Sequence, residues 1–361
     1  LVGTCDWIDS MKRRAIVWLC ETTGKSILKL TDEDYNKNGL SDLLALEGSS
    51  YDLNINMFNH FQNTITGWPG GKPGADDSTR PERKSPNSKR VIIFSPHPDD
   101  DVVSMGGTFD RLVSQGHEVH IAYQVKGNIA VSDHDALKFI EVSKDMFKND
   151  SKVPVSELIK ELKNNKPDKI DSQAVRDLKG FIRKREAIAA TRYIGIPDSN
   201  THFMNLPFYD TGRIKKNPPT KKDVLITASL IKKIKPHQIF AAGDLEDPHG
   251  THKVCLDVIL DALDTLKGEK FIKDCWLWLY RGAWLDWDVH DIDMAVPMSP
   301  AQVLRKRKAI FFHQTQKDGV MFQGQDLREF WVRAEERNSE TAEKYKKMGL
   351  ADYAAIESFK R

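Results

Sequence analysis

The sequence lacks the features that define several common classes of protein. It contains no run of about 18 apolar residues, so no membrane-spanning helix is predicted. Lysine and arginine number 54 against 52 aspartates and glutamates, and the net charge of +2 predicts no concentrated basic surface for nucleic acid. The few cysteines are widely spaced and predict neither a disulfide framework nor a thiolate zinc site: Cys5, Cys20, Cys255 and Cys275. We therefore expect a protein of the reducing cytoplasm without nucleic-acid or membrane partners.

An initiating methionine is also missing. The chain begins at Leu1 with a polar stretch that does not have the composition of a signal peptide. We therefore expect the chain to have been cut or processed from a longer polypeptide. Its 361 residues are enough for two domains, or for one large α/β domain with an appendage.

The first 89 residues differ in character from the rest. Residues 1–66 contain one helical stretch near 11–20 and are expected to be the end of an upstream domain or a small appendage. Residues 67–89 contain four glycines and four prolines, which predict a linker without regular structure. The basic side chains of this linker are expected to be solvated: Arg80, Arg83 and Lys84.

Residues 90–320 have the alternating pattern of an α/β domain. The apolar run at 91–94 is typical of a strand buried on both faces. Further elements are expected as strands at 118–125, 202–206, 238–242 and 275–280 and as helices at 101–115, 176–194 and 249–266. This order predicts a Rossmann-like, mostly parallel sheet with helices on both faces, which binds ligands at the carboxyl ends of its strands. No Gly-x-Gly-x-x-Gly follows the first strand, so a dinucleotide is not expected.

Two charged segments flank or interrupt this pattern. Residues 133–180 form a lysine-rich insertion, expected to be either a solvated helical excursion or a lid over the site. The end of the chain, including 321–361, is expected to be a helical tail that packs on the sheet or on a partner, which leaves a homo-oligomer open.

One short segment concentrates metal-binding residue types directly after the first strand. This segment contains His97 between two prolines that stiffen the loop, and then Asp99, Asp100 and Asp101. Imidazole and carboxylate ligands suit a borderline divalent ion such as zinc. Capping the helix would need only one aspartate. The segment therefore favours a metal site at the carboxyl end of this strand.

A second cluster follows the strand at 238–242. His249 and His252 are three residues apart, so on one helical turn they share a face. The spacing alone is weak evidence, because His117 and His120 also have it but open a strand, where residues three apart point to opposite faces. Together the two clusters offer three protein ligands and an open position, the pattern of a catalytic metal that activates water. The residues alone do not tell which aspartate is a ligand and which a base.

Five blocks in a fixed order resemble a known family. Residues 96–101, Pro-His-Pro-Asp-Asp-Asp, are followed by Gly106, Gly107 and Thr108. The other four blocks are Arg183-Lys184-Arg185-Glu186-Ala187, Asp210-Thr211-Gly212, His249-Gly250-Thr251-His252 and His313-Gln314-Thr315-Gln316. Over residues 90–316 the sequence thus resembles the LmbE-like, or PIG-L, zinc de-N-acetylases. Asp101 departs from the family pattern, which has glutamate at this position.

The resemblance implies a role for seven residues. The metal ligands would be His97, Asp100 and His252, and the metal would be Zn²⁺ or another divalent ion such as Fe²⁺. Asp99 would be the general base and His249 the oxyanion stabiliser and acid. Arg183 and Asp210 would hold sugar hydroxyls, although from the residues alone they could be a surface helix charge and a turn residue.

A narrower resemblance covers nearly the whole chain. Residues 67–71, Gly-Trp-Pro-Gly-Gly, and 333–338, Arg-Ala-Glu-Glu-Arg-Asn, are similar to the C-terminal region of long Bacteroidetes-type glucosamine-6-phosphate deaminase proteins. In those proteins a deaminase domain is fused in front of an LmbE-like domain. The similarity implies a fused upstream deaminase domain as a partner of this chain.

Two functions from different classes follow. The first is a zinc-dependent hydrolase of amino-sugar metabolism that removes an N-acetyl group from a small-molecule substrate of the N-acetylglucosamine type. Several basic residues could bind a substrate phosphate or simply be solvated: Lys126, Arg213, Lys215 and Lys216. The second is a non-catalytic metal- or sugar-binding module, the C-terminal half of a glucosamine-6-phosphate deaminase/isomerase, whose tail with Phe330 and Trp331 serves assembly.

Overall fold

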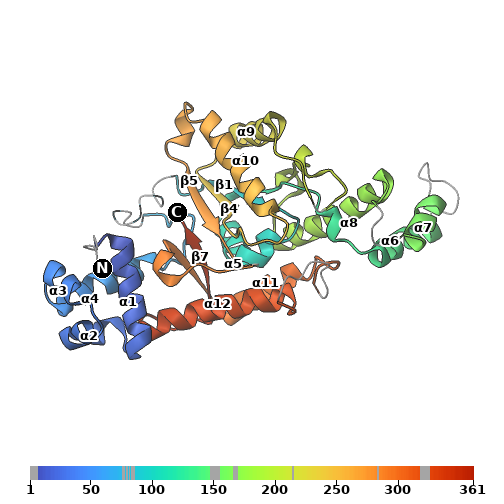
Figure 1. The fold of residues 1–361 in the computed structure, drawn as a ribbon. Helices are drawn as coiled ribbons and strands as arrows, with labels where there is room; N and C mark the ends of the chain where they lie inside the picture. The colour runs from blue at the N-terminus through green and yellow to red at the C-terminus, as the bar shows by residue number, and fades with distance from the viewer. Residues whose placement is uncertain are drawn as a thin grey trace.

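The predicted α/β fold is confirmed by a seven-stranded, mostly parallel sheet with helices on both faces (Figure 1). The computed structural model describes residues 7–74, 78, 80, 82, 86–146, 155–165, 170–213, 215–282, 284–317 and 326–361. The strands lie in the order β3-β2-β1-β4-β5-β7-β6. Their bounds are β1 Arg90–Ser95, β2 Glu118–Tyr123, β3 Thr201–Phe203, β4 Gln238–Ala242, β5 Trp276–Tyr280, β6 Met294–Met298 and β7 Ala355–Lys360.

The centre of the sheet positions the site. Strand β1 pairs in parallel with β2 on one side and with β4 on the other, so the chain order reverses between β1 and β4. The five residues after Arg90 in β1 and all of β4 are buried, as their continuous apolar sequences predict. The loops after β1 and β4 therefore meet at the switch point where open α/β sheets bind ligands.

Two sets of helices cover the sheet. One face packs against α5 Asp100–Ser114, α8 Gln173–Ile194, α11 Pro300–Ile310 and α12 Phe330–Lys347. The other face packs against α9 Lys221–Ile234 and α10 Thr251–Thr265. The described residues also form short 3₁₀ helices, which are η1 Ile27–Lys29, η3 Asn128–Ala130, η4 Asp198–Asn200, η5 Pro207–Tyr209, η6 Lys270–Ile272 and η7 Val289–Asp291.

The described part of the insertion is helical. It contains α6 Asp133–Met146 and α7 Val155–Lys163, which pack on α8 through a small apolar cluster of their own. Figure 1 shows these two helices at the opposite end of the molecule from the N-terminal helices. Lys179 of α8 holds the segment with ion pairs to Asp133 at 2.6 Å and Asp171 at 2.8 Å.

Four helices precede the sheet where the sequence predicts only one. They are α1 Asp9–Thr23, α2 Asp32–Lys37, α3 Ser41–Glu47 and α4 Ser50–Thr64. Helices α2 and α3 are short, and α4 is rich in asparagine, so their periodicity is weak. Helix α2 is fixed by a capping box between Thr31 and Asp34. All four share an apolar core with β6, β7 and α12, and Tyr345 of α12 hydrogen-bonds Thr64 at 2.9 Å.

The predicted purely helical tail is wrong, because the chain ends in β7. This strand inserts between β5 and β6 and runs antiparallel to both. The buried Glu357 at its centre interrupts the apolar pattern that would have predicted a strand. The predicted strand at 202–206 is likewise shortened to end at Phe203, since Asn205 adopts a left-handed φ of 49°.

The segment 67–89 is not the solvated connector that its composition predicts. Pro69, Gly70 and Gly71 are buried, and a Cβ at Gly70 would lie 2.1 Å from the ring of His117. Arg80 is buried rather than solvated and forms an ion pair of 2.5 Å with Glu82. Arg83 and Lys84 lie outside the described residues. The division of the chain into domains stays a prediction.

Within the described residues, no helix combines the length and the apolar composition needed to span a membrane.

Candidate active site

The site lies where the loops after β1 and β4 come together. Residues 96–99 connect β1 to α5, whose first residue is Asp100. The segment between Ala242 and Thr251 connects β4 to α10. Because β1 and β4 are parallel neighbours, their carboxyl ends meet at the same sheet edge, and the two sequence clusters become one.

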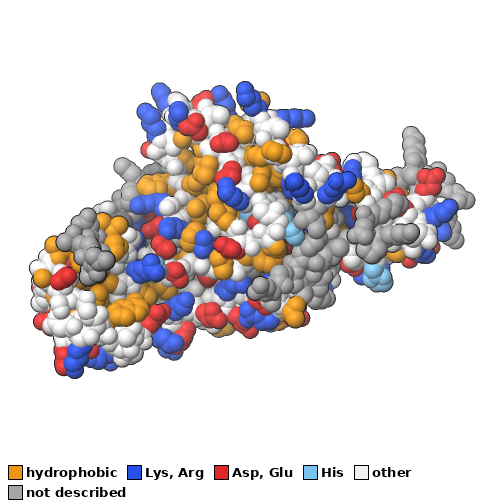
Figure 2. Space-filling view, viewed as in Figure 1, with side chains coloured by type: hydrophobic (Ala, Val, Ile, Leu, Met, Phe, Trp, Pro, Cys, Tyr) orange, Lys and Arg blue, Asp and Glu red, His pale blue; other side chains and the backbone are white. Residues whose placement is uncertain are grey.

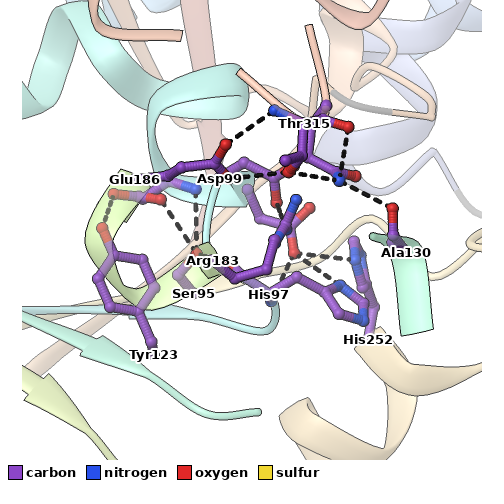
Figure 3. A network of polar contacts seen from close by, with 12 residues as sticks. Ser95, His97, Asp99, Tyr123, Ala130, Arg183, Glu186, His252 and Thr315 are labelled. Atoms are coloured by element: carbon purple, nitrogen blue, oxygen red, sulfur yellow. Dashed lines mark hydrogen bonds and ion pairs between the residues drawn. The ribbon is translucent and has the colours of Figure 1, made fainter. Parts of the chain in front are cut away.

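Three of the predicted residues converge in this place. Asp100 Oδ2 lies 3.1 Å from His97 Nδ1 and 3.2 Å from His252 Nε2 (Figure 3). One potential ligand atom from each of these three residues lies within 4.8 Å of the other two. The backbone N–H of His97 donates to the same Asp100 oxygen at 2.8 Å, which fixes the short loop. The structure thus brings together one carboxylate and two imidazoles from two distant parts of the sequence.

The segment before α10 orients His252. Its Nδ1 lies 2.8 Å from the carbonyl oxygen of Asp244, which accepts its hydrogen and leaves the Nε2 lone pair for a ligand. The carboxylate of Asp247 accepts the backbone N–H groups of Thr251 at 2.8 Å and His252 at 3.2 Å. His249 precedes the helix, because Gly250, with φ of 65°, is its N-cap. The expectation that both histidines share one helical face is therefore wrong.

The charges in the cluster suit a cation. Burial alone would raise the pKa of Asp100, but the adjacent His252 and His97 hold it well below its usual range. Burial opposes protonation of His252, yet Asp100 and the nearby aspartates raise its pKa to about 10, so their negative charge favours a proton or a metal ion on Nε2. The cluster thus consists of a buried, ionised carboxylate between two imidazoles, and one of these imidazoles has its second nitrogen bonded to a carbonyl. Zn²⁺ and Fe²⁺ bind to ligand sets of this kind. The residues therefore fit the metal that the family resemblance implies.

Asp99 lies beside the cluster and pairs with Arg183. The Arg183 Nη2 donates to Asp99 Oδ1 at 2.9 Å, and the arginine is only 1% exposed, so it is not a surface helix charge. Burial raises the pKa of Asp99, Arg183 opposes this rise, and the charge of Asp100 adds to it. Asp99 also has φ of 155° and ψ of −28°, a conformation that L residues rarely adopt and that is typical of functional sites.

A pocket opens next to these residues, with an empty volume of about 660 Å³ that includes the part open to solvent. Its lining includes six of the seven predicted residues: His97, Asp99, Asp100, Arg183, His249 and His252. Asp210 does not line it; its carboxylate lies 3.8 Å from Lys126 Nζ and 3.9 Å from Arg176 Nε. Burial, with the neighbouring His97, lowers the pKa of His249.

Asp101, which replaces the glutamate of the family, is buried behind the pocket. It accepts hydrogen bonds from the hydroxyls of Ser95 at 3.2 Å and Tyr123 at 3.0 Å. Burial raises its pKa to about 7. The shorter side chain is therefore held by the first two strands and does not line the pocket.

Two further blocks of the resemblance meet across the fold. The Glu186 carboxylate of α8 accepts the backbone N–H and the hydroxyl of Thr315, both at 2.8 Å. Gln316 in turn donates to the carbonyl of Ala130 at 3.0 Å. Glu186 and Thr315 thus fix the chain after α11 beside Arg183, which Figure 3 shows on the same helix as Glu186.

The block at 106–108 is explained by a break in α5. Met105 has non-helical φ and ψ of −135° and 27°, so the N–H groups that follow lose their helical partners. Glu357 of β7 accepts from Gly107 N at 2.9 Å and Thr108 N at 2.6 Å, and Lys306 of α11 pairs with Glu357 at 2.8 Å. A Cβ at Gly107 would lie 2.2 Å from Met298 Sδ, so any larger residue would have to displace the Met298 side chain.

Several pocket residues were missed by the sequence analysis as parts of the site. Tyr209 comes from η5, and Ile129, Trp284 and Phe330 form apolar parts of the lining. Lys216 also lines the pocket, and from the sequence it is only one of four basic residues that could bind a substrate phosphate. The one sequence signal for Tyr209 is its position next to Asp210, which the resemblance places in the site. The sequence associates Phe330 with assembly, because no local pattern places the start of α12 at this pocket.

Comparisons with known proteins give a family match for the central part of the chain. Residues 92–263 match the family model of PIG-L, described as GlcNAc-PI de-N-acetylase. The chain is also 54% identical to a glucosamine-6-phosphate deaminase-like protein of Bacteroides thetaiotaomicron over 368 residues, 99% of this chain and 56% of that protein. The chain therefore spans about half the length of this curated relative.

Solved structures are similar to this chain at low identity. The N,N′-diacetylchitobiose deacetylase of Pyrococcus horikoshii is 18% identical, with a TM-score of 0.47 over 75% of this chain and 83% of that one. GalB, the 4-carboxy-2-hydroxymuconate hydratase of Pseudomonas putida, is 15% identical, with a TM-score of 0.46 over 75% and 95%. At these identities the likeness concerns the fold only. The family match, together with the ordered motifs, shows a PIG-L (LmbE-like) domain over residues 92–263.

Proposed function

We propose that this pocket hydrolyses the N-acetyl amide of an amino sugar of the N-acetylglucosamine type, with Zn²⁺ or Fe²⁺ held by His97, Asp100 and His252. The observation that carries the proposal is the convergence of these three side chains beside Asp99 in one pocket. The match to a family described by a de-N-acetylase supports amide hydrolysis. A divalent cation at this position would supply positive charge that polarises the amide carbonyl and lowers the pKa of a water molecule.

Asp99 is the proposed general base. Burial raises its pKa, which strengthens the carboxylate as a base, while Arg183 at 2.9 Å keeps it oriented and ionised. In the reaction, Asp99 takes a proton from the attacking water, and the water oxygen bonds to the acyl carbon. The carbon–nitrogen bond then breaks, acetate leaves, and the proton held by Asp99 passes to the amine nitrogen.

His249 is the proposed stabiliser of the developing oxyanion. Because burial lowers its pKa, we expect a neutral ring at neutral pH, which donates a hydrogen bond from its N–H to the carbonyl oxygen. A neutral ring does not act as the acid that the resemblance implies, so we assign that step to Asp99. Arg183 has two further donors, Nε and Nη1, without a hydrogen-bond acceptor in the described part of the chain, and these can bind sugar hydroxyls. The same role for Asp210 depends on the sequence resemblance alone.

The longer relative suggests a place for this reaction. We include in the proposal that the deacetylated amino sugar is passed to a deaminase domain in front of this chain, since the relative is deaminase-like and this chain covers only 56% of it. A deaminase acts on a free amine, which is what amide hydrolysis releases.

Substitution of Asp99 tests the hydrolase against the non-catalytic module. The experiment measures bound metal and acetate release from N-acetylglucosamine and its 6-phosphate. We expect Asp99→Asn to retain metal and to lose about 10²–10⁴-fold in turnover, the usual contribution of a general base. The matched control is Asp264→Asn on the exposed side of α10, which we expect to be unchanged. Equal turnover in Asp99→Asn and wild type would overturn the assigned base, and absence of metal after repletion would overturn the site.

A further inference from the structure

The charged side chains that line the pocket differ in whether other groups of the protein pair with them. Three carboxylates line it, and each has partners. Asp100 lies between two imidazoles, Asp99 accepts from Arg183, and Asp247 accepts two backbone N–H groups at the start of α10. Apart from Arg183 and the histidines, the remaining basic side chain in the lining is that of Lys216.

Lys216 is a half-buried cation without an ion-pair partner among the described residues. Its Nζ donates to the carbonyl oxygen of Arg213 at 2.7 Å and lies 3.7 Å from the centre of the Tyr209 ring. Within the described ranges, no carboxylate oxygen lies within the 4.0 Å of an ion pair with it. The nearby Asp210 is directed instead toward Lys126 and Arg176. Burial lowers the pKa of Lys216 to about 8, which still leaves it mostly charged at neutral pH.

The position of Lys216 makes it available to a ligand. The residue lines the same pocket as His249 and His252, and the Tyr209 ring that it contacts also meets His97 edge-on, at 6.1 Å between ring centres. On the face shown in Figure 2, lysine and arginine side chains lie close to a histidine near the middle of the surface. A partly desolvated ammonium fixed by an aromatic ring and a carbonyl oxygen is a preorganised site for an anion.

We infer that the substrate carries an anionic substituent, a phosphate or a carboxylate, and that Lys216 binds it. The inference rests on the proposed function and specifies its substrate class as an acidic N-acetylated amino sugar. Lys216 is thereby a specificity-determining residue, because an anionic group completes its charge pairing whereas a neutral hydroxyl does not. A structural role of Lys216 in holding the loop through Arg213 and Tyr209 would affect all substrates alike.

The test is a ratio of specificity constants measured with the 361-residue chain. Acetate release is compared for N-acetylglucosamine 6-phosphate, N-acetylmuramic acid and neutral N-acetylglucosamine, which separate phosphate, carboxylate and no charge. In the wild type we expect kcat/KM for one acidic sugar to exceed that for the neutral sugar at least about 10-fold. Lys216→Gln, which keeps a donor for the Arg213 carbonyl, is expected to lower this ratio about 10- to 100-fold, mainly through KM.

Two further variants complete the design. Lys216→Arg restores the charge and is expected to recover the ratio to within about 3-fold. Lys222→Gln, at an exposed position in the first turn of α9, is the matched control and is expected to leave the ratio unchanged. An equal loss on all three sugars in Lys216→Gln, or no preference for either acidic sugar in the wild type, would overturn the inference.

Failure of the hydrolase can be separated from failure of this inference. If no sugar releases acetate, the proposed reaction is wrong, and calorimetric binding of glucosamine 6-phosphate and glucosamine then tests Lys216 by itself. Tighter binding of the phosphorylated sugar that is lost in Lys216→Gln would support the anion site. Equal binding of the two sugars would overturn it.

Discussion

Two ion pairs contact helix α5, one at its start and one at its middle, and they differ in how completely their atoms are bonded. At the start, Arg183 gives one N–H to Asp99, while its Nε and Nη1 find no acceptor in the described residues. At the middle, both oxygens of Glu357 accept hydrogen bonds, and Lys306 Nζ donates to Glu357 and to Asn338, each at 2.8 Å. Both cations are almost fully buried.

The difference separates a binding site from a structural contact. Buried donors without acceptors cost stability, and because Arg183 also lines the pocket we interpret its Nε and Nη1 as sites for a ligand. Asp99 also has a backbone conformation that L residues rarely adopt. Glu357, paired with Lys306, only accepts the backbone N–H groups that the break in α5 at Met105 leaves without helical partners. The first pair is therefore incomplete in the protein alone, and the second stabilises the helix on which the first is built. Removing the cation from each pair, with its carboxylate left in place, tests this interpretation.

The largest effect on stability is expected for Lys306→Met. Glu357 is 0% exposed, so its charge would be left buried and unpaired, and we expect the free energy of unfolding to fall by about 3–5 kcal/mol. Urea denaturation measures this loss. Lys308→Met, at an exposed position of the same helix, is the control and should change stability by less than about 0.5 kcal/mol. A loss as small as that of the control would show that the carboxylate is solvated or protonated at little cost.

The second effect is on activity and is expected for Arg183→Met. Arg183 lowers the pKa of Asp99, so its removal lets burial raise that pKa further. Because only the ionised carboxylate accepts a proton, the acid limb of kcat/KM should move to higher pH. At neutral pH we expect a loss of about 100-fold, with a smaller loss of stability than in Lys306→Met because Asp99 borders the pocket.

Arg185→Met, exposed on the same helix, is the control for this variant and should leave the pH profile in place. A fall in turnover without a shift of the acid limb would contradict the role of Arg183 in tuning Asp99. A stability loss larger than that of Lys306→Met would reverse the comparison between the two pairs.

The smallest effect is expected for Gly107→Ala. The new methyl group would meet Met298 at 2.2 Å, and displacement of this buried but flexible side chain should cost about 1–2 kcal/mol of unfolding free energy. Gly268→Ala is the control, since no atom lies within 4 Å of the position that its methyl group would take. Thermal unfolding of the two variants measures the difference, and equal melting temperatures would show that α5 can move away from β6 freely.

Much of the fold could be predicted because its signals are local. The buried strands β1 and β4 are continuous apolar runs, and β4 has the predicted bounds. The helix α8 and most of α5 follow the apolar periodicity. The errors fall where burial is decided at long range. Strand β7 was not predicted because the buried Glu357 interrupts its apolar pattern, and Arg80 is buried although it is charged. Phe330 lines the pocket, although it belongs to a tail that the sequence associates with assembly.

The candidate site divides in the same way. The residue types and spacing of 96–101 and 247–252 predict a metal, and the family resemblance assigns the ligands; their roles stay predictions. The order of the strands in the sheet then brings the two clusters together, because β1 and β4 are neighbours at the switch point. The lining from η5, the loop around Trp284 and the start of α12 has no counterpart in any local pattern.

The sequence by itself determined the α/β class, the central strands and the ordered motifs of the PIG-L family, because these depend on residues close along the chain. Only the tertiary structure decided which charges are completed by the protein and which are left for a ligand. Arg183, Lys216 and Lys306 are all basic residues in polar stretches, and their sequence surroundings do not distinguish them. What distinguishes them is whether a carboxylate from another element packs against each, and that depends on contacts between residues 51 to 84 positions apart in the sequence.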